Sequence, residues 1–109
     1  MCIRDRAEVV HHPTIADGLA GGGDDGSVTN DLIASHDVPL VLVPEIEIRR
    51  AVREAVENNG IVIEGSASAS YAAITNDLVD DATSRIGFIA SGRNISLELL
   101  LEILREPLA

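Results

Sequence analysis

The sequence predicts an α/β fold in which the strands of a parallel sheet alternate with helices that cover it. Three short apolar runs, 39–43, 61–63 and 86–90, are rich in β-branched or other apolar residues and are typical of buried strands. Patterns with helical spacing lie before, between and after these runs. Because strands alternate with helices along the chain, a parallel sheet covered by helices is favoured over an antiparallel one.

The boundaries of the helices are marked by local signals. Ser27 is a suitable N-cap for the first helix, Pro44 sets the first turn of the second, and Asn59-Gly60 is a stop signal. Pro107 ends the last helix, in which we expect a buried leucine face (Leu97, Leu100, Leu101 and Leu104). The expected helices are 27–36, 44–58, 65–73 with Asp77 near its end, and 96–106.

Composition limits the function. The chain has 109 residues, enough for one small domain, and a formal net charge of −10, so nucleic-acid phosphates would be repelled. Phe88 and Tyr71 are its two aromatic residues and offer no stacking platform for bases. No apolar run approaches the ~20 residues that span a bilayer, so no membrane partner is expected. The single Cys2 suits a reducing compartment, and we expect a cytoplasmic protein.

Several apparent motifs do not predict a site. His11-His12 precedes Pro13 without a cysteine at ligand spacing, so no metal site is predicted. The glycine-rich run 21–26 contains two aspartates that would repel a phosphate, which favours a surface loop. Residues 1–6 resemble translated sequencing-adapter sequence, and we treat 7–109 as the native part; a frayed N-terminus is the alternative.

Three polar stretches are candidates for one site. Ser91 follows the last predicted strand, where α/β sheets bind ligands, and its neutral hydroxyl can bond a ring nitrogen without protonating it. Glu64 precedes a helix whose dipole would favour its charge. Asp17-Gly18 offers a carboxylate and a positive-φ residue in a tight turn. Each signal alone is common in a turn or on a surface, and only their joint order indicates a site.

The joint order resembles the C-terminal part of threonine and serine dehydratases. These enzymes depend on pyridoxal phosphate and share fold type II with the tryptophan synthase β subunit. The resemblance covers about 13–106, through Thr14-Ile15-Ala16-Asp17-Gly18, then Glu64-Gly65-Ser66, then Ser91-Gly92-Arg93-Asn94. It implies that 7–109 is the C-terminal part of the catalytic domain, a portion of the large domain.

Residue roles follow from the resemblance alone. Ser91 would meet the pyridine nitrogen of the cofactor, with Gly92 and Asn94 in the same loop. Glu64 would lie near the ring, and Asp17 and Gly18 would line the substrate side, with Gly18 counted among the cofactor-binding residues. Arg93 departs from the family pattern, which has a second glycine there, and we assign it no role.

The implied reaction is β-elimination of water and deamination of L-threonine or L-serine to a 2-oxo acid and ammonia. The chain contains no lysine, so it lacks the Schiff-base residue, and we expect it to have no catalytic residue of its own and to be inactive alone. We expect the lysine and the phosphate-binding glycines upstream, no regulatory domain after the last helix, and a homo-oligomeric full-length enzyme. A serine racemase of the same family and a small acidic non-catalytic α/β interaction domain are the alternatives.

Overall fold

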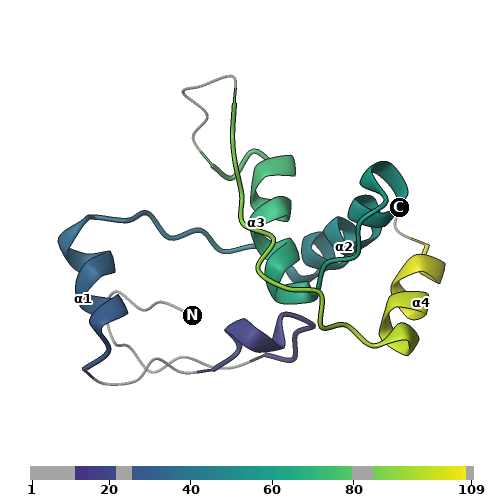
Figure 1. The fold of residues 1–109 in the computed structure, drawn as a ribbon, viewed down its shortest axis with the longest axis horizontal. Coiled ribbons are helices and arrows are strands. Elements are labelled where there is room, and N and C mark those ends of the chain that lie inside the picture. The colour runs from purple at the N-terminus through teal and green to yellow at the C-terminus, as the bar shows by residue number, and fades with distance from the viewer. Residues whose placement is uncertain (1–11, 22–25, 80–84, 108–109) are drawn as a thin grey trace.

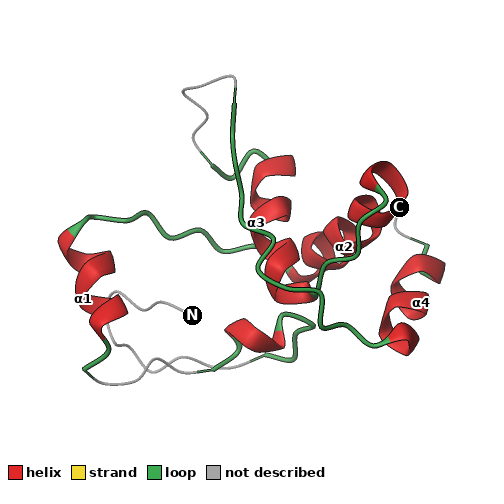
Figure 2. Ribbon diagram, viewed as in Figure 1, coloured by secondary structure: helices red, strands yellow, loops and turns green. Residues whose placement is uncertain are grey.

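The computed structural model of the chain describes residues 12–21, 26–79 and 85–107. Helices joined by extended segments make up these residues (Figures 1 and 2). The predicted adapter-like segment, 1–6, lies outside the described residues. The elements are a short 3-10 helix, η1 (Asp17–Leu19), and four α-helices, α1 (Val28–Ser35), α2 (Glu45–Asn59), α3 (Gly65–Thr75) and α4 (Leu97–Arg105).

The core lies where α2 packs against α3 on one side and α4 on the other, whereas α1 packs against no other described helix (Figure 1). The predicted apolar face of α2 is confirmed, since four of its residues are buried. Ser68 of α3 is fully buried, and its hydroxyl donates to the carbonyls of Gly65 and Ile48 at 2.8 and 3.2 Å. The small residues of α3 thus let it lie close to α2. The main buried residues are Ile48, Ala51, Val52, Ala55, Ala67, Ala72 and Ile103.

The predicted helices are confirmed with shifts of one or two residues at their ends. Gly60 ends α2 in the left-handed conformation, with φ 65°, and the Ile61 amide donates back to the Ala55 carbonyl at 3.1 Å. Ser96 caps α4, because its hydroxyl accepts from the Leu99 N–H at 3.1 Å. Local signals in the sequence were therefore sufficient to place these two helix ends.

The prediction that the leucines of α4 form its buried face is wrong in part. Ile103 is the fully buried residue of α4, whereas Leu97 is 70% and Leu101 37% exposed. Burial of Ile103 and charge pairing both fit this orientation: Arg49 of α2 donates to the carboxylate of Glu106 and to Glu102. With the Ile103 side of α4 packed toward α2, part of the leucine stripe is left in solvent.

The predicted strands do not form within the described part of the chain. Runs 39–43, 61–63 and 86–90 are extended, but no strand ladder joins them in residues 12–21, 26–79 and 85–107. Ile63 is buried, at 3% exposed, and packs in the core with Ala55 and Ala67, but most other side chains of these runs are exposed, up to 77% for Leu42 and 82% for Ile89. A strand requires a neighbour for its N–H and C=O groups, and the described residues do not supply one along these runs. Of the predicted α/β fold, the structure therefore shows the helices.

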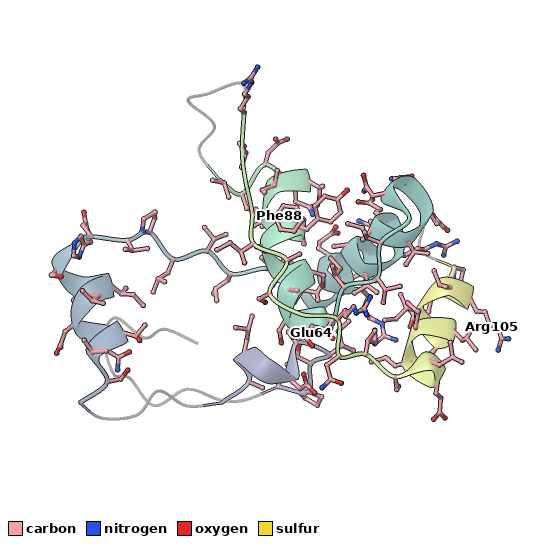
Figure 3. The ribbon with its side chains drawn as sticks, viewed as in Figure 1. Glu64, Phe88 and Arg105 are labelled. Atoms are coloured by element: carbon pink, nitrogen blue, oxygen red, sulfur yellow. The ribbon has the colours of Figure 1, made fainter. Side chains whose placement is uncertain are left out.

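The last extended run lies beside α3. Phe88 stacks on Tyr71 of α3, with ring centroids 5.4 Å apart (Figure 3). The aromatic pair holds the run against the helix and leads the chain toward the amino end of α3. Among the described residues, none of the helices is both long and apolar enough to cross a membrane.

Candidate functional site at the amino end of α3

The three stretches singled out in the sequence meet at the amino end of α3. Glu64 is the N-cap residue of this helix, and the loops that contain Asp17 and Ser91 both make contacts with its first turn or its cap. Figure 3 shows Glu64 where the extended chain that follows Phe88 passes the start of α3. Glu64 and Asn94, 30 positions apart in the sequence, are thereby brought into hydrogen-bonding contact. The same holds for Gly18 and Ser66, which are 48 positions apart.

The loop with Asp17 lies against the first turn of α3. The Gly18 N–H donates to the Ser66 hydroxyl at 2.9 Å. A Cβ atom on Gly65 would lie 2.3 Å from the Ile15 carbonyl oxygen, so the two backbones touch where residue 65 has no side chain. The small residues at the start of α3 are therefore needed for the approach of this loop.

The role expected for Gly18 in the turn is corrected by the structure. Gly18 lies inside η1 and does not have a positive φ. A Cβ atom there would instead lie 2.8 Å from the Ser66 hydroxyl oxygen. Close approach to α3, rather than a left-handed turn, is the reason that a glycine suits position 18.

Glu64 holds the loop that follows Ser91. Its backbone N–H donates to the Gly92 carbonyl at 3.1 Å, and its Oε2 accepts from the Asn94 N–H at 2.9 Å. A Cβ atom on Gly92 would lie 2.7 Å from Oε1 of the same carboxylate. The Glu64 side chain makes no capping bond to α3. The carboxylate expected beside a cofactor ring thus makes a direct contact with the loop backbone.

The remaining predicted side chains are accessible. Ser91, Asn94 and Asp17 are all exposed, and Ser91 is not buried among the leucines of α4. Asn94 contacts Glu64 through its backbone N–H. Ser91 directly precedes Gly92, the glycine that touches Glu64, so this exposed residue lies near the amino end of α3.

One residue in contact with the site was missed by the sequence analysis. Glu45, the first residue of α2, accepts hydrogen bonds from the Thr14 hydroxyl and from the Ile15 N–H, the latter at 2.8 Å. In the sequence it stands after Pro44 in a helix start, where an acidic residue is common because the helix dipole favours it. No local signal indicates that its partners lie about 30 residues earlier.

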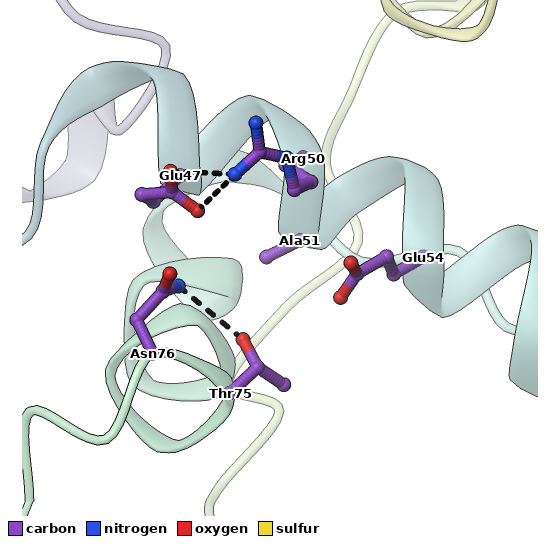
Figure 4. Close-up of a pocket in the computed structure, with 6 residues that line it drawn as sticks. All are labelled: Glu47, Arg50, Ala51, Glu54, Thr75 and Asn76. Carbon is purple, nitrogen blue, oxygen red and sulfur yellow. Dashed lines mark hydrogen bonds and ion pairs between the residues drawn. The ribbon is translucent and has the colours of Figure 1, made fainter. Parts of the chain in front are cut away.

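Hollows adjoin both loops. One of about 420 Å³ lies beside the Ser91 loop and another of about 310 Å³ beside the Thr14 loop. The first is lined by 60–63, Ala90, Gly92 and Arg93, and the second by Thr14, Ala16, Leu19, 41–43, Ile48 and Ala69. A third hollow, of about 240 Å³, lies between α2 and the end of α3, where Arg50 pairs with Glu47 (Figure 4). Gly92 lines the first hollow, and none of the other predicted site residues lines any of the three.

Comparison with known proteins assigns the family. The profile described as pyridoxal-phosphate dependent enzyme matches residues 2–92. The chain belongs to this family. Its relatives include an L-threonine ammonia-lyase from Thermotoga maritima, 33% identical over 106 residues, and a putative threonine dehydratase from Sinorhizobium fredii, 30% identical over 98 residues. A serine racemase from Dictyostelium discoideum is 36% identical over 93 residues.

The family matches cover most of this chain but a small part of each relative. They include 96%, 89% and 84% of the chain, and 26%, 30% and 28% of the ammonia-lyase, the dehydratase and the racemase. The chain therefore spans between a quarter and a third of the length of these family members. No solved structure gave a significant match.

The chemistry of the residues at the amino end of α3 is compatible with one end of the family's cofactor. Ser91 supplies a neutral hydroxyl, which can donate to an unprotonated pyridine nitrogen or accept from a protonated one. The glycine at position 92, pressed against the Glu64 carboxylate, lets the loop pass closely beside α3. The roles of Ser91, Gly92, Asn94, Glu64, Gly18 and Asp17 toward a cofactor or substrate remain predictions.

Proposed function

We propose that this chain is part of a pyridoxal-phosphate-dependent ammonia-lyase that converts L-threonine or L-serine to a 2-oxo acid and ammonia. The observation that carries the proposal is the meeting of the three polar stretches around α3, through Glu64–Asn94, Glu64–Gly92 and Gly18–Ser66 contacts. A relative named L-threonine ammonia-lyase aligns with 96% of the chain, which is 26% of that relative. A cytoplasmic homo-oligomer is part of the proposal.

Ser91 is assigned to the ring nitrogen of the cofactor. When bound, pyridoxal phosphate supplies an electron sink for the negative charge that develops on the amino-acid substrate. A hydroxyl at the nitrogen bonds it without forcing a proton onto it, whereas a carboxylate would favour the protonated ring. An unprotonated ring is a weaker electron sink than a protonated one, which suits elimination better than transamination. Glu64 keeps this loop in place through its contacts with Gly92 and the Asn94 N–H.

Asp17 is assigned to the substrate side. Its carboxylate is exposed on η1, and the preceding residue, Ala16, is 3% exposed, so the loop is anchored while Asp17 faces solvent. A carboxylate there can accept hydrogen bonds from the ammonium or β-hydroxyl group of an amino acid. The hydrogen bond from the Gly18 N–H to the Ser66 hydroxyl holds the C-terminal end of the same loop.

The amine that carries the cofactor must come from outside these 109 residues. The eight basic residues apart from histidine are all arginines, and a guanidinium does not form a Schiff base at neutral pH. This chain therefore supplies the ring-nitrogen and substrate sides of the proposed site, and it does not supply the side-chain amine.

A chimaera tests the proposed function. This chain replaces the matching 106-residue segment of the Thermotoga maritima L-threonine ammonia-lyase. We expect the purified chimaera to bind pyridoxal phosphate and to release 2-oxobutanoate and ammonia from L-threonine. A monodisperse chimaera that binds the cofactor but does not deaminate L-threonine or L-serine would contradict the proposal.

Serine racemisation is the second candidate, because the Dictyostelium discoideum serine racemase has 36% identity to the chain. Elimination and racemisation both begin with removal of the α-proton. Chiral chromatography of the chimaera's products from L-serine separates them, since a racemase gives D-serine and a dehydratase gives pyruvate.

A non-catalytic interaction domain makes a different prediction about the isolated chain. It would be monomeric and unfold cooperatively as 109 residues. The exposed apolar runs around Leu42 and Ile89 favour part of a larger enzyme instead, because surfaces of this kind normally pack against further chain. Sedimentation of the isolated chain distinguishes the two, with self-association expected for part of an enzyme.

A further inference from the structure

The carboxylate of Glu45 binds the beginning of the loop that contains Asp17. Its Oε1 accepts from the Ile15 N–H at 2.8 Å, and its Oε2 accepts from the Thr14 hydroxyl. The Thr14 hydroxyl oxygen accepts in turn from the Ala16 N–H at 3.0 Å. One side chain of α2 therefore satisfies, directly or through Thr14, three donors in three successive residues of the loop.

A carboxylate suits this place for two reasons. It has two acceptor oxygens and no donor, which matches the two donors that face it. Glu45 also begins α2, where the dipole of the helix favours a negative charge. Because Glu45 is only partly exposed, its charge-assisted bonds are less screened than those of a surface ion pair.

The other end of the loop is bound to a different helix. The Gly18 N–H donates to Ser66 of α3, and the Ile15 carbonyl rests against Gly65. Asp17 thus lies between an anchor on α2 and an anchor on α3. The position of its carboxylate depends on both, whereas the Ser91 loop is held separately by Glu64.

We propose that Glu45 is a positioning residue that fixes Asp17 on the substrate side of the site. The inference rests on the proposed function, in which Asp17 meets the amino-acid substrate. Loss of the Glu45 contacts should weaken the use of substrate more than the affinity for cofactor, because the contacts of the Ser91 loop do not include Glu45.

The test uses matched variants of the chimaera described above. Glu45→Gln removes the charge and turns one acceptor into a donor, and Thr14→Val removes the hydroxyl. Thr14→Ser keeps the hydroxyl and is the conservative rescue. Glu47→Gln is the control, because Glu47 lies in the same helical turn but bonds Arg50, at 2.6 and 2.8 Å.

Three quantities are measured: hydrogen exchange of the peptide 12–19 by mass spectrometry, KM and kcat for L-threonine, and the dissociation constant of pyridoxal phosphate. For Glu45→Gln and Thr14→Val we expect the hydrogen-exchange rate of the peptide 12–19 and KM for L-threonine each to rise about tenfold. This is the change expected from loss of one hydrogen bond to a charged group. Cofactor affinity should change less than KM. Thr14→Ser and Glu47→Gln should match the unsubstituted chimaera.

The outcomes separate this inference from the proposed function. If Glu45→Gln exchanges at the same rate as Glu47→Gln, Glu45 does not hold the loop and the inference is wrong. Faster exchange with an unchanged KM in an active chimaera would also overturn it, because the loop would then not position the substrate. An inactive unsubstituted chimaera would contradict the proposed function and the substrate half of the inference, while exchange would still show whether Glu45 anchors the loop.

Discussion

The carboxylate of Glu64 lies directly against Gly92, so closely that a Cβ atom on residue 92 would meet Oε1 at 2.7 Å and Cδ at 2.9 Å. The same carboxylate accepts from the Asn94 N–H at 2.9 Å. Contact with a glycine and a bond to the backbone two residues later together hold the Ser91 loop beside α3. The contact is thus the link between the acidic and the hydroxyl-bearing parts of the proposed site.

We expect Gly92→Ala to displace the Glu64 carboxylate and break its bond to Asn94. A lost bond to a charged group costs about 1.5–3 kcal/mol, so the affinity of the chimaera for pyridoxal phosphate should fall by about tenfold or more. The double variant Gly92→Ala, Glu64→Ala removes the clash, and its effects should be less than the sum of the two single changes. Strictly additive effects would show that the two residues do not act through this contact.

Gly65→Ala should be more damaging than Gly92→Ala to folding. The new methyl group would lie 2.3 Å from the carbonyl oxygen of Ile15 and 2.6 Å from its carbonyl carbon, and backbone cannot move aside as a side chain can. Overpacking of this kind costs about 1–3 kcal/mol or more, which should lower the urea midpoint of the chimaera. Gly87→Ala is the matched control, since nothing lies within 4 Å of its Cβ position. Equal urea midpoints for Gly65→Ala and Gly87→Ala would argue against the close packing of Gly65 on Ile15.

The Arg49–Glu106 pair should make the docking of α4 sensitive to acid. The hydrogen bond from Arg49 lowers the pKa of the Glu106 carboxyl, and the same bond raises the pKa of Arg49. Because the folded-state pKa of Glu106 is lowered, its stabilisation is complete above the unfolded value of about 4.3 and is lost as the pH falls through the folded value. The stabilisation that goes with the raised pKa of Arg49 is present at every pH below the pKa of arginine in the unfolded chain. It would therefore be lost only in strong base.

Glu106→Gln measures this contribution. The difference in urea midpoint between the unsubstituted chimaera and Glu106→Gln should shrink between about pH 7 and about pH 3. Glu57→Gln is the control, because Glu57 pairs with Arg53 across one exposed turn, where about 0.2–0.5 kcal/mol is typical. A Glu106→Gln difference that is constant with pH would mean that the ion pair does not stabilise the fold.

Substitution of Ser91 should separate the hydroxyl from the size of the side chain. Ser91→Ala loses a neutral hydrogen bond worth about 0.5–1.5 kcal/mol, so kcat/KM of the chimaera for L-threonine should fall about 2- to 10-fold. Ser91→Asp should reduce elimination further, because a carboxylate favours a protonated ring nitrogen. Ser91→Thr keeps the hydroxyl and is the control. An unchanged kcat/KM in Ser91→Ala would remove the assignment of this residue to the cofactor.

The isolated chain should not form a side-chain adduct with pyridoxal phosphate. It contains no lysine, so borohydride treatment of a mixture with the cofactor should leave every residue side chain unlabelled, with labelling confined to the terminal amine. Peptide mapping by mass spectrometry checks this, and the chimaera serves as the positive control. A pyridoxyl group on an internal residue would contradict the prediction.

The sequence by itself determined the helices and the family. Pro44 and Gly60 bracket α2, and Ser96 caps α4, because these signals act on backbone groups within one turn of their own residue. The family resemblance was also readable, since each of its three polar stretches is a continuous run of residues. The profile match to residues 2–92 confirms that resemblance.

Only the tertiary structure decided which distant groups meet. Glu45 reads in the sequence as an ordinary helix start, yet it bonds Thr14 and Ile15. Ile103, not Leu97 or Leu101, is the buried residue of α4, because α4 packs on α2 with its Ile103 side, where Arg49 also pairs with Glu102 and Glu106. The apolar runs form no ladder among the described residues, since pairing depends on a partner that a strand's own sequence does not specify. Local bonds are encoded locally, whereas long-range contacts depend on the packing of the whole chain.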